Sequence, residues 1–474
     1  MTGFRTISNL FVLFRTQRLL VKKCRQSWIS STFPSCVLAS LNLLPICAMG
    51  NCKSVSNPDV DTALNKLHAS NSMSVSLSRK HIGPEGAKNL GKGLQQYNIK
   101  TLNLPTNDLG LPGIKALEQA LLHQRNSLIE LDLRGNQIND KAAQIVGNIF
   151  RDSSTLEKLN LSNNQIGSQG IKAIAQIHSL KQLRLVNNNI GPEGAIALGA
   201  LLPQSQLEIL SLERNNIDFY GASKLIEHIP QSTTLRTINL SHNRIESSAL
   251  TYLEQGLGTL RELHVADCEI DFQGVEVLAR ALQTNTSLVE LNLRENKIGS
   301  GGAIAMGNCL KQNTTVQYLY ISTNEIDVDG ARSLADGLKE NSTLRELRLS
   351  SNIFSADGTI AIFAALKVNK TLNTLGMDES GKLDVDAIAL IGDALQQNHD
   401  LASLSLSRNQ IDEEGGRALL AALKRNDTLK TINLAGNDLS DGLRKQSIRS
   451  WNVATSQTFS LDSLLGRHPR TLSS

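Results

Sequence analysis

Residues 128–138 have the sequence Leu-Ile-Glu-Leu-Asp-Leu-Arg-Gly-Asn-Gln-Ile, and this arrangement of leucines, asparagine and isoleucine returns about every 28 residues. A degenerate unit that includes Val75, Leu77 and Ile82 precedes it. The asparagine position holds, in chain order, Asn107, Asn136, Asn164, Asn188, Asn215, Asn243, Cys268, Asn296, Asn324, Asn352, Ser380, Asn409 and Asn437. Fixed-period self-similarity indicates a repeat array, in which each unit buries its apolar face only by stacking on its neighbours.

Each unit has two halves with different periods. Leu131-Asp132-Leu133 alternates apolar and polar residues, which is typical of a short strand with one buried face. The segment that starts at Gly191-Pro192 places small and apolar residues at helical spacing, and proline suits the first helical turn. Paired strands lie ~4.8 Å apart, whereas packed helices lie ~8–10 Å apart. We therefore predict an α/β solenoid curved into a horseshoe, with a parallel β-sheet on the concave face and helices on the convex face.

The repeated asparagine falls where the strand turns away. Its amide can satisfy backbone groups that leave the sheet at that point. Cys268 and Ser380 occupy this position in two units and can replace the amide only in part. The units 164–188 and 243–268 are shorter than the others, so we expect truncated outer helices and a local change of curvature there.

The motif resembles the leucine-rich repeats of the ribonuclease-inhibitor type, over about residues 72–440 and about 14 units. NOD-like receptors and Ran GTPase-activating proteins carry similar repeats, but this chain has no P-loop sequence for nucleotide binding. The resemblance implies protein recognition and does not identify a partner. We expect a non-catalytic interaction scaffold, not an enzyme, that needs no cofactor, metal or small-molecule substrate.

The alternative function is that of a GTPase activator of the Ran GTPase-activating type, which would need a rigidly placed arginine near the bound GTPase. That family carries its arginine in a lengthened loop, within a Phe-Thr-Gly-Arg-like segment, and usually has an acidic region after the repeats. Arg134 follows an early strand but lies in an ordinary repeat, and the residues after 440 are basic. Both departures argue against GTPase activation.

The net charge of +4 is unevenly distributed. The first 58 residues contain seven basic residues and no acidic one, residues 441–474 are rich in Ser, Thr and Arg, and the part between carries −6. An acidic array argues against nucleic acid as a partner. We interpret residues 1–71 as a basic leader, disordered or used in targeting, and residues 441–474 as a disordered tail.

Residues 49–54, Met-Gly-Asn-Cys-Lys-Ser, match the N-myristoylation pattern, and Cys52 is a candidate for palmitate beside it. Two acyl chains anchor a protein stably, whereas one myristate does so only marginally. The signal acts only if translation starts at Met49 and exposes Gly50. We expect a cytoplasmic protein with peripheral membrane attachment through Gly50 and Cys52. A chance match and an organelle transit peptide in residues 1–48 are the alternatives.

The six cysteines form no disulfide framework and no zinc-ligand spacing, which favours a reducing compartment. Five Asn-x-Ser/Thr sequons recur at one phase of the repeat. We interpret their asparagines as residues near helix C-termini, where left-handed backbone is tolerated, and not as glycosylation sites. They are Asn285, Asn313, Asn341, Asn369 and Asn426.

One stretch of the concave sheet differs from the rest in composition. Tyr and Arg most often anchor protein interfaces, and Tyr318 and Tyr320 point the same way from one strand. Alternatively, Glu and Arg on adjacent strands merely pair across the sheet. We predict a protein-binding patch formed by His264, Glu290, Arg294, Glu295, Tyr318, Tyr320, Arg345, Glu346 and Arg348.

Overall fold

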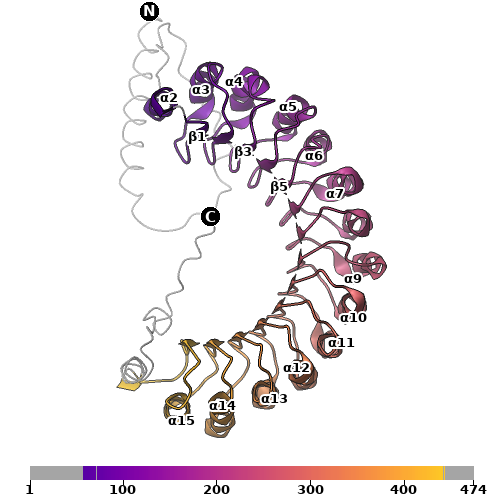
Figure 1. The fold of residues 1–474 in the computed structure, drawn as a ribbon, viewed down its shortest axis with the longest axis vertical. Helices are drawn as coiled ribbons and strands as arrows, with labels where there is room; N and C mark the ends of the chain where they lie inside the picture. The colour runs from indigo at the N-terminus through magenta and orange to yellow at the C-terminus, as the bar shows by residue number, and fades with distance from the viewer. Residues whose placement is uncertain (1–56, 71, 441, 444–474) are drawn as a thin grey trace, which may run out of the picture. The chain divides into compact units, whose positions relative to one another are not determined.

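The computed structural model describes residues 57–70, 72–440 and 442–443. In this part of the chain, fourteen three-residue strands form one parallel sheet, and each strand pairs with the next in chain order (Figure 1). The strands are β1 (Ser74–Ser76), β2 (Thr101–Asn103), β3 (Glu130–Asp132), β4 (Lys158–Asn160), β5 (Gln182–Arg184), β6 (Ile209–Ser211), β7 (Thr237–Asn239), β8 (Glu262–His264), β9 (Glu290–Asn292), β10 (Tyr318–Tyr320), β11 (Glu346–Arg348), β12 (Thr374–Gly376), β13 (Ser403–Ser405) and β14 (Thr431–Asn433).

The middle residue of each strand belongs to the core. Leu291, Leu319 and Leu347 are register partners on β9, β10 and β11, and all three are fully buried. The residues on either side of each leucine are partly exposed. The two-residue period therefore separates a leucine core from a solvent-facing sheet surface.

Helices cover the outer side of the repeat array, whereas the strands follow its inner side (Figure 1). They are α2 (Pro58–Ser70), α3 (Gly83–Leu94), α4 (Gly110–His123), α5 (Asp140–Phe150), α6 (Ser168–Ile174), α7 (Gly191–Leu201), α8 (Phe219–Ile226), α9 (Glu246–Ala249), α10 (Phe272–Thr284), α11 (Gly299–Leu310), α12 (Val328–Glu340), α13 (Ser355–Leu366), α14 (Val385–Gln397) and α15 (Glu413–Leu423), with short 3₁₀ helices η2 (Leu202–Gln204), η3 (Ile229–Gln231) and η4 (Leu250–Gln255). The predicted solenoid, with its parallel sheet on the concave face, is confirmed.

Glycines let adjacent helices pack closely. A Cβ atom added to Gly307 on α11 would lie 2.4 Å from the backbone oxygen of Ser333 on α12. No side chain fits into that space, so a larger residue would push the helices apart. Gly307 is therefore required for the packing of α11 against α12.

The motif asparagines connect successive units, and Asn164 shows how. Its side-chain oxygen accepts hydrogen bonds from the backbone N–H groups of Asn136 (2.9 Å) and Ile138 (3.0 Å) in the preceding unit. Its amide nitrogen donates to the carbonyl of Leu161 (2.8 Å) in its own unit and of Leu133 (3.2 Å) in the preceding one. One buried amide thus satisfies four backbone groups where the chain leaves the sheet.

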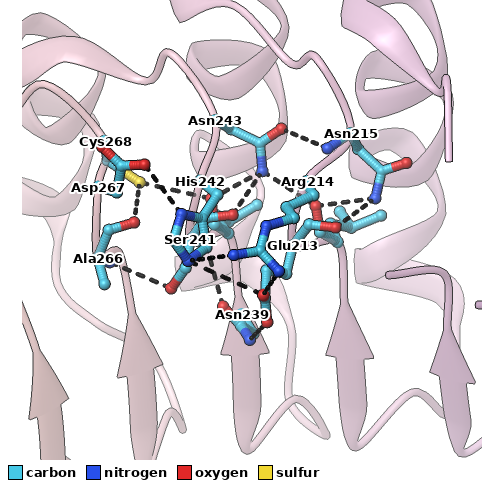
Figure 2. A network of polar contacts seen from close by, with 12 residues as sticks. Glu213, Arg214, Asn215, Asn239, Ser241, His242, Asn243, Ala266, Asp267 and Cys268 are labelled. Carbon is cyan, nitrogen blue, oxygen red and sulfur yellow. Dashed lines mark hydrogen bonds and ion pairs between the residues drawn. The ribbon is translucent and has the colours of Figure 1, made fainter. Parts of the chain in front are cut away.

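The two irregular positions behave as their chemistry predicts. The Cys268 thiol lies 3.4 Å from the carbonyl oxygen of Leu240 and 3.3 Å from that of Ala266, but it has one hydrogen to donate (Figure 2). The Ser380 hydroxyl donates only to the carbonyl of Asp378, within its own unit (3.3 Å). The two short units have short helices, α6 with seven residues and α9 with four, as predicted.

The described array begins before residue 72, where we had placed its boundary. Helix α2 starts at Pro58, and its Val60 and Leu67 are buried in the continuous core. Asp59 on this helix pairs with Lys80 at 2.9 Å. Residues 58–70 therefore cover the open end of the first unit and are not part of a disordered leader. A repeat pattern could not reveal α2, because the helix does not carry the motif.

The sequon asparagines do not adopt the left-handed conformation that we predicted. None of them has a positive φ, and Asn341 has a φ of −75° and a ψ of 133°. Instead Asn313, Asn341, Asn369 and Asn426 form a second row of buried amides that bond to the preceding unit. Asn341, for example, donates to the carbonyls of Leu310 (2.8 Å) and Asn313 (3.1 Å). Left-handed residues lie beside the motif asparagines, as at Glu295 with a φ of 55°.

The hydrogen bonds of the motif asparagines predict that Cys268→Asn stabilises the fold. An asparagine there would donate to the Leu240 carbonyl and accept from the backbone of the preceding unit, and a net gain of about 1 kcal/mol is typical of a buried hydrogen bond. Asn188, in the other short unit, already donates to the Leu161 carbonyl and accepts from the Ile166 N–H, both at 3.0 Å. Urea unfolding measures the change. Cys268→Ala should not stabilise, and equal stability of the two variants would contradict the prediction.

Candidate functional site

The tyrosines of the predicted patch lie side by side on the solvent face of β10. Tyr318 and Tyr320 are both half-buried and flank the buried Leu319. In the register of the sheet, Tyr318 lies between Glu290 and Glu346 on the adjacent strands. Neither tyrosine hydroxyl makes a hydrogen bond to a described residue. Their ring edges and hydroxyls are thus available to a molecule on the concave face.

A row of carboxylates runs beside the tyrosines. Across the sheet, Glu290 on β9 is the register partner of Glu262 on β8, and Glu346 on β11 is the register partner of Tyr318 on β10. Glu346 accepts a hydrogen bond from the Arg348 Nε on its own strand at 2.7 Å, so this pair forms along a strand and not across the sheet. Glu290 has no such partner, and its nearest basic group is the His264 ring at 3.9 Å. Like charges directly opposite each other destabilise a sheet.

The pKa values at this centre are shifted mainly by burial, and the neighbouring carboxylates add a smaller effect. Burial raises the pKa of the Glu290 carboxyl above its ordinary value of 4.5, and Glu262 and Glu346 raise it further. Burial raises the pKa of Tyr320 to about 12, with Glu290 and Glu346 adding to the effect. Burial lowers the pKa of His264 although Glu262 lies 3.8 Å away. The face is therefore short of positive charge at Glu290.

The other predicted residues are not gathered at this centre. Arg294 and Glu295 are exposed beyond the C-terminal end of β9, and Arg345 is exposed just before the N-terminal end of β11. They lie at opposite ends of the strands, so the nine residues form a band and not one cluster. Glu262 belongs to the centre and was missed, although its position in the repeat matches that of Glu290. Gly50 and Cys52 lie outside the described residues.

A second polar network, absent from the sequence predictions, lies one unit earlier in the array (Figure 2). His242 contacts Asp267 at 2.9 Å and faces Arg214 at 3.4 Å and Glu213 at 3.9 Å. The Ser241 hydroxyl accepts a hydrogen bond from the backbone of Ala266 and makes none with His242. The cluster thus contains a histidine–carboxylate pair without an activated nucleophile, and its polar contacts link three consecutive units.

The described residues contain no group of His, Cys, Asp and Glu side chains that could hold a metal ion. Cys268 and Cys309 are buried free thiols, and burial raises their pKa values to about 12 and about 11. Both would remain protonated and unreactive in the folded protein at neutral pH. Arg134, the residue considered for GTPase activation, is held against Asp132 at 3.3 Å within an ordinary unit.

Comparison with known proteins agrees with this geometry. The family model described as Leucine Rich repeat matches nine segments, namely residues 125–144, 152–175, 176–199, 231–253, 259–279, 284–307, 312–335, 340–363 and 397–420. An internalin from Listeria monocytogenes has a similar fold, with a TM-score of 0.51 over 80% of this chain and 95% of the internalin, at 19% sequence identity. That identity supports the fold alone.

Two curated relatives match part of the array. Ribonuclease inhibitor from pig is 26% identical over 196 residues, which are 40% of this chain and 38% of the inhibitor. The mouse NACHT, LRR and PYD domains-containing protein 12 is 27% identical over 197 residues, which are 41% of this chain and 17% of the relative. The match thus spans well under half of either relative.

We predict that Glu290→Gln stabilises the fold at pH 7. Because the folded-state pKa is raised, the folded protein binds this proton more tightly than the unfolded chain does, and stability falls as pH rises through the window above about 4.5. Glutamine removes that loss. Urea midpoints should therefore be higher for the variant at pH 7 and equal to the wild type at about pH 3, where the carboxyl is protonated in both states. The exposed Glu325→Gln is the control, and an equal gain there would contradict the assignment.

Proposed function

Because the chain is a leucine-rich repeat protein of the ribonuclease-inhibitor type, we propose that it is a non-catalytic scaffold that binds a protein partner on its concave face. The observation that carries this proposal is the pair Tyr318 and Tyr320, half-exposed on one strand with free hydroxyls. Tyrosine supplies a large rigid contact surface with a polar tip, and such residues concentrate binding energy in interfaces.

The charges around the tyrosines favour a basic side chain on the partner. Glu290 and Glu346 flank Tyr318, and Glu262 lies beyond Glu290 on the next strand. Among the described residues, only Glu346 of these three carboxylates has an arginine partner. A guanidinium or ammonium group placed on a tyrosine ring could also pair with Glu290. Binding would relieve the repulsion that raises the Glu290 pKa.

The double variant Tyr318→Ala/Tyr320→Ala should weaken partner binding by more than about 2 kcal/mol, which is roughly thirtyfold in Kd, because both anchors are lost. The partner would be isolated with the full chain and its Kd measured by calorimetry. Tyr220→Ala is the matched control, since Tyr220 is 53% exposed on α8, away from the sheet. An unchanged Kd in the double variant would exclude this patch as the binding surface.

We further propose that the scaffold acts in the cytoplasm and is held at a membrane by myristate on Gly50 and palmitate on Cys52. The support is the sequence pattern at residues 49–54 and the need for two acyl chains. The described residues include no helix with the length and apolar character of a membrane span.

Gly50→Ala should release the protein from membranes, because it removes the acceptor of the first acyl chain, while Cys52→Ser should leave only transient attachment. Fractionation of cells that express the full coding sequence measures both effects. Mass spectrometry of the mature N-terminus is the decisive control. A terminus near residue 2 would exclude acylation at Gly50, and an unmodified terminus at about residues 25–50 would favour the transit-peptide alternative.

A further inference from the structure

A pocket of about 450 Å³ lies where the chain enters strands β7 to β10. Its walls carry two arginines, Arg236 and Arg261, together with five hydroxyl side chains and no carboxylate. The nine-residue patch predicted from the sequence includes none of these residues. The pocket is therefore a separate feature of the surface, with an excess of positive charge.

The two arginines are neighbours, and neither forms an ion pair with another residue in the described part of the chain. They occupy the same position in successive units, and the Arg261 backbone N–H donates to the Arg236 carbonyl at 2.7 Å. The Arg261 guanidinium contacts no hydrogen-bonding or charged group among the described residues. Arg236 reaches only the backbone carbonyls of Thr233, Leu235 and Thr259, at 3.4–3.5 Å. Two like charges side by side are unfavourable unless something compensates them.

The same repeat position is neutralised elsewhere. Lys181 and Glu157 occupy it in two earlier units and form an ion pair at 2.9 Å. The fold can therefore pair opposite charges at this position. Arg236 and Arg261 instead place two cations at the wall of the pocket, which is the arrangement expected of an anion site.

Two sequon asparagines hold the turns that supply threonines to the pocket. The side-chain oxygens of Asn285 and Asn313 accept hydrogen bonds from the backbone of Ser287 and Thr315, both at 3.0 Å. These turns leave the intervening residues Thr286 and Thr314 exposed at the pocket. Their hydroxyls make no hydrogen bond to a described residue and are free to donate.

We propose that this pocket binds a phosphate monoester. Guanidinium groups match phosphate oxygens with paired N–H donors, and hydroxyls add donors of short reach. A phosphate monoester carries about −1.5 to −2 charges and three acceptor oxygens, which suits two arginines and two free threonines better than a carboxylate does.

The phosphate belongs to a phosphorylated side chain of the protein partner, and this choice of source rests on the proposed function. Val289 and Gln317 line the pocket and directly precede Glu290 and Tyr318 on the concave patch. The pocket therefore begins one residue before Tyr318 along the strand, so a partner segment that binds on Tyr318 also reaches the pocket. One partner would place a basic side chain on the patch and a phosphorylated one in the pocket.

The first test titrates the full chain with inorganic phosphate and with N-acetyl-phosphoserine amide by calorimetry, at an ionic strength held constant with KCl. Arg261→Ala and Arg236→Ala should each weaken binding by about tenfold or more, as expected for the loss of a charged hydrogen-bond donor. Lys430→Ala is the matched control, because Lys430 is exposed at the same repeat position outside the pocket. No binding by the wild type, or equal binding by wild type and Arg261→Ala, would overturn the proposal.

The second test identifies the source of the phosphate. Phosphatase treatment of the isolated partner should weaken its binding to the wild-type chain tenfold or more and have little effect on binding to Arg261→Ala. If inorganic phosphate binds but phosphatase treatment changes nothing, the pocket takes a free phosphate compound and the assignment to a protein side chain is wrong. Tyr318→Ala/Tyr320→Ala should keep its affinity for inorganic phosphate, so failure of the concave patch and failure of the pocket are distinguishable.

Discussion

The buried asparagine amide at the end of most strands is the interaction on which the rest of the structure depends. After a three-residue strand the chain turns away from the sheet, and the backbone groups of that turn would be unpaired without the asparagine amide. Asn164 satisfies four of them, one in its own unit and three in the unit before. Repetition of this contact keeps the strands short and in register, so the flanking residues of all strands face the same side.

That arrangement separates stability from recognition. The leucines, glycines and asparagines carry the fold, and the residues on either side of each leucine are free to vary. Two unfavourable pairs occur among the free positions, Glu262 beside Glu290 and Arg236 beside Arg261. Neither pair is needed by the core, and each costs stability through like-charge repulsion. Stability given up at exposed positions is a physical reason to look there for binding partners.

The period of the sequence was sufficient to predict what repeats. The parallel sheet, the outer helices and the short helices α6 and α9 all follow from spacing. What depends on neighbouring units could not be predicted in the same way. The sequon asparagines had the residue type of a left-handed cap, but a carbonyl of the preceding unit, as at Leu310, favours an extended conformation in which the amide reaches it. The pairs Glu262–Glu290 and Arg236–Arg261 follow from the sheet register, which places residues 28 and 25 positions apart side by side.

The solenoid architecture also determines how binding defects can be interpreted. Each unit contacts mainly its neighbours, so the effect of a substitution on stability remains local. The tyrosine pair on β10 and the arginines before β7 and β8 belong to three different units, and all four side chains are at least partly exposed. Removing them leaves the leucine core and both asparagine rows in place. A loss of affinity in such variants therefore reports a lost contact with the ligand and not a distorted sheet.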